Sequence, residues 1–383
     1  MGLPELVLKV RVQGRHPWFY RKMIRKPERP LRSGGAVQVV DRERRFVGVG
    51  FYNPRTELAL RMLAREPVED PGAYLVAALD RALDLREQIL RLPEVTNAYR
   101  LVHAEGDGFP GLVLDRLGDT VVAQVFALCL MDHMEALGEH LLRRAPGTRL
   151  VLTVDEQAAE REGIERPPRS RPHTTEVVEH GVRYEVQPGH GHKTGFFADQ
   201  RDNRLLVREL ARGRRVLDLC CHAGGFALAA ARGGARTVLA VDLDEAAVAQ
   251  ARGNAARNGL RYDVRHDDAF EVLRGVRPGA HDLIVLDPPK WAAGRGEVEQ
   301  GLRRYADANR LALAALSAGG ILVTCSCSGA VSEDAFLRML RGAAAEAGRD
   351  ARILAVRGAG PDHPVALECP ETRYLKVVAL EVR

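Results

Sequence analysis

The chain has 383 residues, enough for two or three domains, and its 46% hydrophobic and 28% charged residues are typical of an ordinary globular protein. No apolar run approaches the ~20 residues of a membrane span, and the first residues lack the apolar core of a secretory signal. The six cysteines lack the paired C-x2-4-C spacing of a zinc site. We therefore expect free thiols, no metal and a cytoplasmic location.

The positive charge of the chain is concentrated near its N-terminus. Residues 1–66 contain 15 Lys and Arg but only 6 Asp and Glu, a net charge of +9; since the whole chain carries +5, the remainder carries −4. A basic module joined to a mildly acidic body indicates a polyanionic partner such as nucleic acid. The alternative is a solvated charged face without a partner.

Residues 1–66 are expected to form a small β-rich domain, because short apolar runs alternate with turn residues. An aromatic cluster at 16–20 precedes a basic run. Aromatic rings among cations suit unpaired bases and phosphates. We therefore expect RNA binding by Trp18, Arg21, Lys22, Arg25 and Lys26. The alternative is that Trp18 and Phe19 fill the inside of a small barrel.

Residues 67–175 are expected to form a middle α+β domain. Apolar residues at helical spacing predict helices over 71–92 and 131–145, with strands and glycine turns between them. The proline-rich, charged segment 160–172 is predicted to be a linker or an exposed loop.

A hairpin is predicted over residues 174–187, followed by a polar loop and a helix over 199–211. The loop contains His190 and His192. These two histidines lack further ligands nearby in the sequence, so we expect no metal there.

From residue 215 onward strands and helices alternate, which predicts a doubly wound, Rossmann-like α/β sheet within a domain over 176–383. The first strand ends at a glycine-rich turn that contains Gly224. Asp242 follows Asp218 by 24 positions, near the spacing at which an acidic residue binds a ribose in nucleotide-binding folds. The G-x-G-x-x-G and G-x-x-x-x-G-K-[ST] patterns are both absent, so we expect an adenosine-type ligand without phosphates.

Two stretches carry candidate catalytic residues. Asp287 begins Asp-Pro-Pro-Lys directly after an apolar strand, and ligands of open α/β sheets bind beyond the carboxyl ends of strands. Cys325 and Cys327 lie two positions apart on the strand predicted over 321–327, so they share a face, and Cys327 is nearer the strand's end. The alternatives are a structural turn at Asp287 and an inert buried cysteine at Cys327.

The motifs VLDLCCHAGGF, AVDLD, DDAF and LDPPK resemble those of class I S-adenosylmethionine-dependent methyltransferases. The resemblance implies S-adenosyl-L-methionine as the cofactor. It also implies which residues bind it: Asp218 and Gly224 beside the methionine part, Asp242 at the ribose, Asp268 and Ala269 at the adenine, and Leu243 as a further contact.

The match extends over nearly the whole chain. The PUA-like N-terminus and the strings KTGFFADQRDNR, TCSCSG and HPV resemble the PUA-domain-containing family that methylates cytosine in 23S ribosomal RNA. By this resemblance Phe197 and Arg201 approach the cofactor, and the guanidinium fork of Arg201 suits the methionine carboxylate. The resemblance implies an RNA partner, with Lys290 as a further contact. A homodimer is compatible with the sequence.

Methylation at carbon 5 of a cytosine needs covalent help, because that carbon is a poor nucleophile. A thiolate at Cys327 that adds to carbon 6 makes carbon 5 nucleophilic, and Asp287 would hydrogen-bond the ring nitrogen or the exocyclic amine. Two alternatives stay open. One is amino-group methylation of adenine or guanine, which favours an aromatic residue where this chain has Lys290. The other is a non-catalytic RNA-binding assembly factor.

Overall fold

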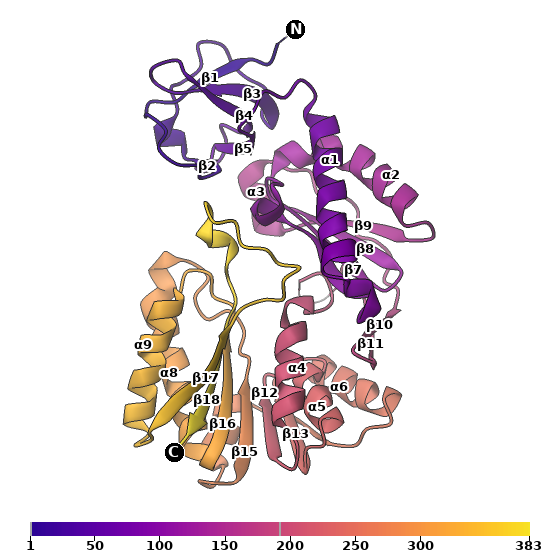
Figure 1. The fold of residues 1–383 in the computed structure, drawn as a ribbon, viewed down its shortest axis with the longest axis vertical. Helices are drawn as coiled ribbons and strands as arrows, with labels where there is room; N and C mark the ends of the chain where they lie inside the picture. The colour runs from indigo at the N-terminus through magenta and orange to yellow at the C-terminus, as the bar shows by residue number, and fades with distance from the viewer. Residues whose placement is uncertain (1, 191–192) are drawn as a thin grey trace. The chain divides into compact units, whose positions relative to one another are not determined.

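The computed structural model describes residues 2–190 and 193–383, which fall into two compact units (Figure 1). Unit 1 comprises Met1–Val178, Val186–Ala198 and Pro361–Thr372, and unit 2 comprises Glu179–Glu185, Asp199–Gly360 and Arg373–Arg383. The expected limits of three domains, at 66 and 175, stay a prediction. His192, considered above as a metal ligand, lies outside the described residues.

The first part of unit 1 is a small β-structure, as the sequence predicts. Its strands are β1 (Glu5–Val7), β2 (Trp18–Phe19), β3 (Gly35–Val40), β4 (Phe46–Tyr52) and β5 (Leu60–Ala64), in the order β1-β3-β4-β5-β2. The apolar run 6–12 contributes only the short β1, which pairs in parallel with β3. Phe19 is 5% exposed and belongs to the core of this β-structure, so the barrel-filling alternative holds for Phe19.

The second part of unit 1 is a sheet covered by helices. Strands β6 (Ala98–His103), β7 (Leu112–Leu117), β8 (Thr120–Val125) and β9 (Arg149–Val154) lie in that order, and helices α1 (Pro71–Asp84) and α2 (Met134–Arg144) share one apolar core with them. Asp70 caps α1, because its carboxylate accepts hydrogen bonds from the first backbone N–H groups of the helix. The short helix α3 (Glu156–Glu162) reaches into the predicted linker, and the rest of that segment has no regular structure.

The predicted hairpin is present as β10 (Thr175–Glu179) and β11 (Val182–Val186). Its turn falls at His180 and Gly181, which both have positive φ angles.

Unit 2 is built on one sheet whose strands lie in the order β14-β13-β12-β15-β16-β18-β17. Their bounds are β12 (Arg215–Leu219), β13 (Thr237–Asp242), β14 (Asp263–His266), β15 (His281–Leu286), β16 (Leu316–Ser326), β17 (Ala351–Arg357) and β18 (Lys376–Val382). β12 to β16 run parallel, and β18 runs antiparallel between β16 and β17. The strand order reverses between β12 and β15. In open α/β sheets this is where ligands bind.

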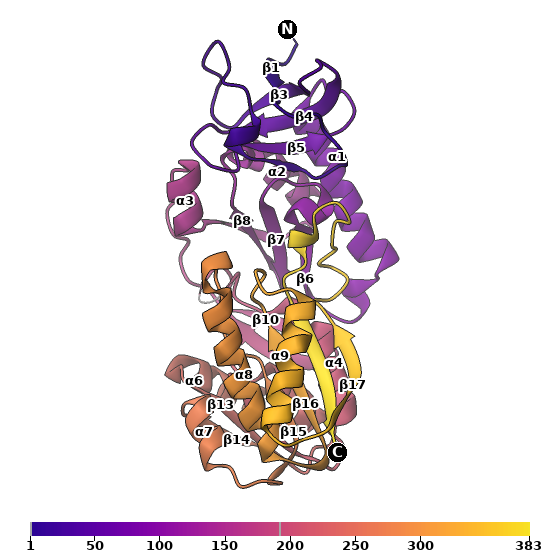
Figure 2. The same cartoon turned by 90° about the vertical axis from the view of Figure 1, so that its left-hand side faces the viewer.

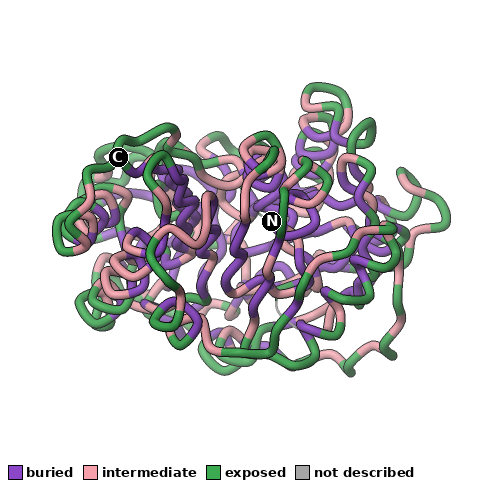
Figure 3. The backbone as a smooth tube through the Cα atoms, turned by 90° about the horizontal axis from the view of Figure 1, so that it is seen from below, coloured by how far each residue is buried: buried purple, intermediate pink, exposed green. Residues whose placement is uncertain are grey.

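Helices cover both faces of this sheet (Figures 1 and 2). One face packs against α4 (Arg201–Leu210), α5 (Gly225–Arg232) and α6 (Glu245–Arg257), and the other against α7 (Ala269–Gly275), α8 (Val298–Ala315) and α9 (Glu333–Glu346). The two apolar layers enclose the strands, and Figure 3 shows buried backbone inside each unit with exposed loops around it. The predicted doubly wound α/β fold is confirmed.

The sequence did not predict β17. It lies at one edge of the sheet, and its side chains are mostly exposed, with Ile353 52% and Leu354 45% exposed. Among the described residues no helix is both long enough and apolar enough to span a membrane.

Candidate active site

The loop after β12 is held in an unusual backbone conformation. Cys220, His222 and Gly224 all have left-handed φ angles, of 58°, 47° and 79°. A Cβ atom at Gly224 would lie 2.7 Å from the hydroxyl oxygen of Tyr262, so only glycine fits there. Left-handed conformations at residues other than glycine cost energy, and they cluster at functional sites. The loop therefore brings bare backbone to the reversal point of the sheet.

Asp218 is fully buried at the carboxyl end of β12. Its Oδ2 atom accepts a hydrogen bond of 2.8 Å from the backbone N–H of Ala227, in the first turn of α5. Its Oδ1 atom has no hydrogen-bond partner among the described residues. Burial raises the pKa of Asp218 well above its usual value, and the charges of Asp287 and Asp242 add to this. A cationic group bound at Oδ1 would relieve that cost.

Asp242 ends β13 and fixes the loop between β12 and α5. Its Oδ2 atom accepts a hydrogen bond of 2.7 Å from the backbone N–H of His222, and its Oδ1 atom accepts one of 2.9 Å from Asp244. Leu243 follows Asp242 and is 66% exposed. Asp242 therefore lies beside the glycine-rich loop, as the sequence indicated.

Asp268 and Ala269 begin α7. The Oδ1 atom of Asp268 accepts hydrogen bonds of 2.8 Å and 3.2 Å from the backbone N–H groups of Phe270 and Glu271, so Asp268 is the N-cap of this helix. The backbone N–H of the preceding Asp267 donates to the carbonyl of Asp242 at 3.0 Å. The capping turn thus lies next to the end of β13, and contact with an adenine stays a prediction.

Arg201 and Phe197 belong to different units. Arg201 begins α4 in unit 2, is only 1% exposed, and donates from Nε to the carboxylate of Asp202 at 3.2 Å. Phe197 belongs to unit 1, where the ammonium group of Lys193 lies 4.5 Å from the centre of its ring. Their contacts with a cofactor stay predictions.

Asp287 follows β15 and is held by a chain of amide side chains. The side-chain amide of Gln200 donates a hydrogen bond of 3.0 Å to its Oδ2 atom. The amide of Asn203 in turn donates to the Oε1 atom of Gln200 at 2.7 Å. Gln200 and Asn203 are 3% and 0% exposed, so the position of the Asp287 carboxylate is fixed from the protein interior.

Cys325 lies on β16 and is fully buried. Burial raises the pKa of its thiol well above the usual value, and the neighbouring Asp287 carboxylate raises it further. The Cys325 side chain hydrogen-bonds with those of Gln200 and Asp287. Cys325 therefore packs beneath the Asp287 carboxylate as a protonated thiol.

Cys327 follows the last residue of β16 and is partly exposed, and it packs on the same apolar layer as Cys325. The predicted strand thus ends one residue before Cys327, but the shared face is confirmed. Charge on Cys327 raises the pKa values of two buried neighbours, Tyr305 and Lys376. Cys327 therefore combines access from solvent with a nearby cation.

Lys376 begins β18 opposite Ser326, the last residue of β16, and is 2% exposed. Burial lowers its pKa to about 8, and Cys327 acts in the opposite direction by favouring the ammonium form. The exposed Lys290, which follows Asp-Pro-Pro, also contributes to the lowering of the Lys376 pKa. Lys290 is therefore near the two cysteines, whereas its contact with RNA stays a prediction.

The N-terminal residues predicted to bind RNA lie around β2. Trp18 is partly buried, and its indole N–H donates to Glu105 at 2.8 Å. Arg21 forms an ion pair of 2.8 Å with Glu57. Lys22, Arg25 and Lys26 are exposed. Arg21 and Trp18 thus have partners within unit 1, and RNA binding by all five stays a prediction.

Sequence reasoning missed two residues of this site, Gln200 and Lys376. Gln200 lies in the segment that drew attention to Arg201, but its amide carries no pattern of its own. Lys376 did leave a signal, because it is a charged residue within the otherwise apolar run 375–380. A buried lysine in a strand is rare unless it has partners.

Comparison with protein families identifies two regions. The S-adenosylmethionine-dependent methyltransferase family matches residues 156–356, just over half of the chain, and the PUA-like domain matches residues 9–65. Among curated proteins, the ribosomal RNA large subunit methyltransferase I of Escherichia coli (strain SMS-3-5 / SECEC) is 33% identical over 96% of both chains. The enzyme of the same name from Erwinia tasmaniensis is also 33% identical over 96% of both.

Two solved structures share the fold over nearly the whole length. One is described as a methyltransferase complexed with SAH, with a TM-score of 0.81, 21% identity and 96% of each chain covered. The other is described as a SAM-dependent methyltransferase from Streptococcus mutans, with a TM-score of 0.82, 20% identity and coverage of 99% of this chain and 100% of that chain.

Proposed function

This chain belongs to the S-adenosylmethionine-dependent methyltransferases, within the family of ribosomal RNA large subunit methyltransferase I, and from that premise we propose that it methylates carbon 5 of a cytosine in 23S ribosomal RNA. In this proposal Cys327 forms a covalent adduct with the base, and Asp287 holds the base in place. S-adenosylmethionine is the methyl donor. The observation that carries the proposal is the partly exposed Cys327 beside the buried Lys376 at the reversal edge of the sheet.

The residues after β12 fit this donor. Asp218 offers a buried carboxylate oxygen that has no partner among the described residues, suited to the cationic amino group of a methionine. Gly224 leaves bare backbone beside it, and Asp242 lies where ribose hydroxyls would be bound. When bound, the donor supplies an electrophilic methyl group on a sulfonium.

Accessibility favours Cys327 over Cys325 as the nucleophile. Cys325 is fully buried, and its thiol stays protonated because burial and Asp287 both raise its pKa. Cys327 is partly exposed, and the ammonium of Lys376 favours a negative charge on its sulfur. A flipped-out cytosine can therefore reach Cys327 alone of the two.

The reaction proceeds through one adduct. The Cys327 thiolate forms a bond to carbon 6, and the electron pair displaced from the C5–C6 double bond lets carbon 5 take the methyl group. A base then removes the proton of carbon 5, the C5–C6 double bond re-forms, and the thiolate leaves. Asp287, held by Gln200, accepts a hydrogen bond from the exocyclic amine or the protonated ring nitrogen of the cytosine.

The amino-group alternative requires a ring that stacks on the flipped base. The candidate is Trp291, which is packed against Tyr305 with ring centres 4.7 Å apart and under the guanidinium of Arg304 at 4.9 Å. These contacts engage the Trp291 ring within the protein and favour the cysteine route. The assembly-factor alternative involves no chemistry at all, so detection of donor-dependent methylation excludes it.

Two matched variants test the proposal. Wild type, Cys327→Ala and Cys325→Ala are incubated with large-subunit ribosomal RNA and donor, and the digested nucleosides are analysed by mass spectrometry. We expect 5-methylcytidine from wild type and Cys325→Ala and none from Cys327→Ala. Methylated adenine or guanine, or full activity of Cys327→Ala, would overturn the proposal.

The position of the methylated nucleotide follows from bisulfite sequencing of the same RNA. Comparison of deproteinised RNA with the intact subunit shows which of the two is the substrate. A homodimer stays a prediction, which light scattering of the purified protein tests.

A further inference from the structure

The β-structure of unit 1 contains a pocket that none of the predicted RNA-binding residues lines. Its volume is about 580 Å3, and its lining comes from the segment after β1, the turn between β3 and β4, and the residue after β5. The residues are Arg11, Val12, Gly14, Arg15, Asp41, Arg45, Phe46, Val47 and Arg65. Four guanidinium groups thus face one carboxylate.

The carboxylate is already engaged. Asp41 accepts hydrogen bonds from the side chain of Arg45 at 2.6 Å and 2.9 Å and from backbone N–H groups of the turn at 2.9 Å and 3.0 Å. The side chain of Arg45 lowers the pKa of Asp41, so Asp41 is ionised and neutralises Arg45. The positive charge of the other three arginines is therefore left to the pocket.

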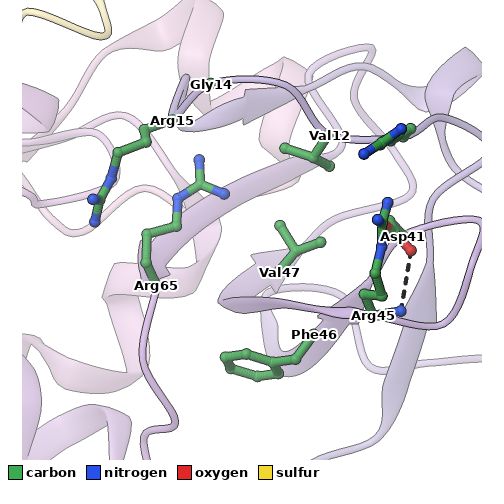
Figure 4. Close-up of a pocket in the computed structure, with 9 residues that line it drawn as sticks. Val12, Gly14, Arg15, Asp41, Arg45, Phe46, Val47 and Arg65 are labelled. Atoms are coloured by element: carbon green, nitrogen blue, oxygen red, sulfur yellow. Dashed lines mark hydrogen bonds and ion pairs between the residues drawn. The ribbon is translucent and has the colours of Figure 1, made fainter.

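Arg15 and Arg65 bring two like charges together. Figure 4 shows their side chains on one side of the pocket, with Arg45 and Asp41 on the other side and Val47 between. Arg65 is partly buried and donates a hydrogen bond of 2.9 Å to the carbonyl of His16, which fixes its position. Burial and the charge of Arg15 both lower the pKa of Arg65. An anion between the two guanidiniums would remove this repulsion.

The pocket also offers apolar contact. Phe46 is 41% exposed at the start of β4, and Val12 and Val47 are partly exposed beside it. An exposed aromatic face beside guanidinium groups suits a base stacked next to its own phosphate. An inorganic anion would use the arginines but not this surface.

We propose that this pocket binds a nucleotide of single-stranded RNA, with its phosphate between Arg15 and Arg65 and its base against Phe46. The proposal rests on the proposed RNA substrate but not on the chemistry of Cys327. It assigns RNA contact to the 11–15 segment and the β3–β4 turn, in addition to the basic run after β2.

The test uses the full chain and a fluorescein-labelled single-stranded RNA taken from the methylated region. Anisotropy titrations over a range of salt concentrations compare wild type with the double variant Arg11→Glu/Arg15→Glu, and with Phe46→Ala. We expect the double variant to bind at least tenfold more weakly, with a salt slope smaller by roughly 1.4, the value for two lost phosphate contacts. Phe46→Ala should weaken binding severalfold without a change in slope.

Arg42→Glu is the matched control, because Arg42 is exposed in the same turn but does not line the pocket. It should bind RNA more than the double variant does, and close to wild type. Equal losses for Arg42→Glu and the double variant would mean unspecific charge attraction and would overturn the proposal. Unchanged RNA affinity of the double variant, with an unchanged thermal unfolding midpoint, would also overturn it.

Cys327→Ala separates this proposal from the catalytic one. It should bind the RNA as wild type does, because the pocket lies in unit 1 and Cys327 in unit 2. The pocket variants, in turn, should bind S-adenosylhomocysteine with unchanged affinity in calorimetry. Loss of that affinity in the pocket variants would show misfolding rather than loss of a nucleotide site and would contradict the proposal.

Discussion

The ammonium nitrogen of Lys376 lies 2.6 Å from the carbonyl oxygen of Ser328 and donates a hydrogen bond to it. A second hydrogen bond, of 2.8 Å, runs to the carbonyl of Tyr374. The first acceptor belongs to the residue directly after Cys327, so the buried cation is fixed beside the end of β16. Two backbone acceptors thus hold a positive charge where the proposed reaction needs a thiolate.

Replacement of Lys376 by Met should slow methyl transfer by about 10–100-fold, because the cation that favours the thiolate is lost. The pKa of Lys376 is about 8, so the group is an ammonium below this pH and neutral above it. The kcat/KM of wild type should therefore fall as pH rises through about 8. In Lys376→Met this alkaline limb should be absent, as shown by rate measurements from pH 6 to pH 10.

A stability measurement separates this role from a merely structural one. The folded-state pKa of Lys376 is lowered from 10.5 to about 8, so the unfolded chain binds the proton more tightly. The buried ammonium costs stability below about pH 8, and this cost disappears as the pH rises towards 10.5. Lys376→Met should remove this pH dependence of thermal unfolding and bind donor normally. An unchanged alkaline limb in the variant would contradict the assignment.

Asp218→Asn should weaken binding of S-adenosylhomocysteine at least tenfold, since a hydrogen bond to a charged group contributes about 1.5–3 kcal/mol. Calorimetry of the two proteins measures this.

The same variant should be more stable than wild type without ligand at pH 7. Because burial raises the pKa of Asp218, the folded state holds its proton at pH values where the unfolded chain has lost it, so stability falls as pH rises above about 4. Asparagine avoids this cost and still accepts from the N–H of Ala227. Lower stability together with unchanged ligand affinity would show that Asp218 is a structural residue.

Gly224→Ala should destabilise the protein by about 1–3 kcal/mol and weaken donor binding, because of its left-handed φ angle and the hydroxyl of Tyr262 nearby. Gly253→Ala is the matched control. Gly253 lies within α6 with nothing within 4 Å of its Cβ position, so alanine there should stabilise by about 0.4–1 kcal/mol. Urea unfolding followed by circular dichroism measures both. Equal effects of the two substitutions would refute the tight-loop explanation.

The sequence predicted those parts of the site that are encoded locally. Asp218, Gly224 and Asp242 belong to strand ends and one turn, so strand–helix alternation and glycine spacing place them correctly beside one another. Gln200 and Lys376 could not be placed in this way. Gln200 is 87 positions from Asp287, and Lys376 is 49 positions from Cys327. Only the packing of α4 and the antiparallel insertion of β18 bring them together.

Edge strands and surface pockets were harder to predict for a different reason. β17 has exposed side chains on both faces, so apolar alternation gives no clear strand signal there. The arginines of the pocket in unit 1 are spread over 55 positions, from Arg11 to Arg65, and their convergence depends on the pairing of β3 with β4. The aromatic and basic run after residue 16 is contiguous and therefore drew the prediction instead.

The covalent step is tested most directly with an RNA that carries 5-fluorocytidine at the methylated position. Fluorine at carbon 5 cannot leave as a proton, so an adduct that has accepted the methyl group cannot break down. In the presence of donor we expect a stable protein–RNA complex whose tryptic peptide carries the nucleotide on Cys327, and no complex with Cys327→Ala. A nucleotide attached to Cys325, or complete methyl transfer without any trapped complex, would contradict the account.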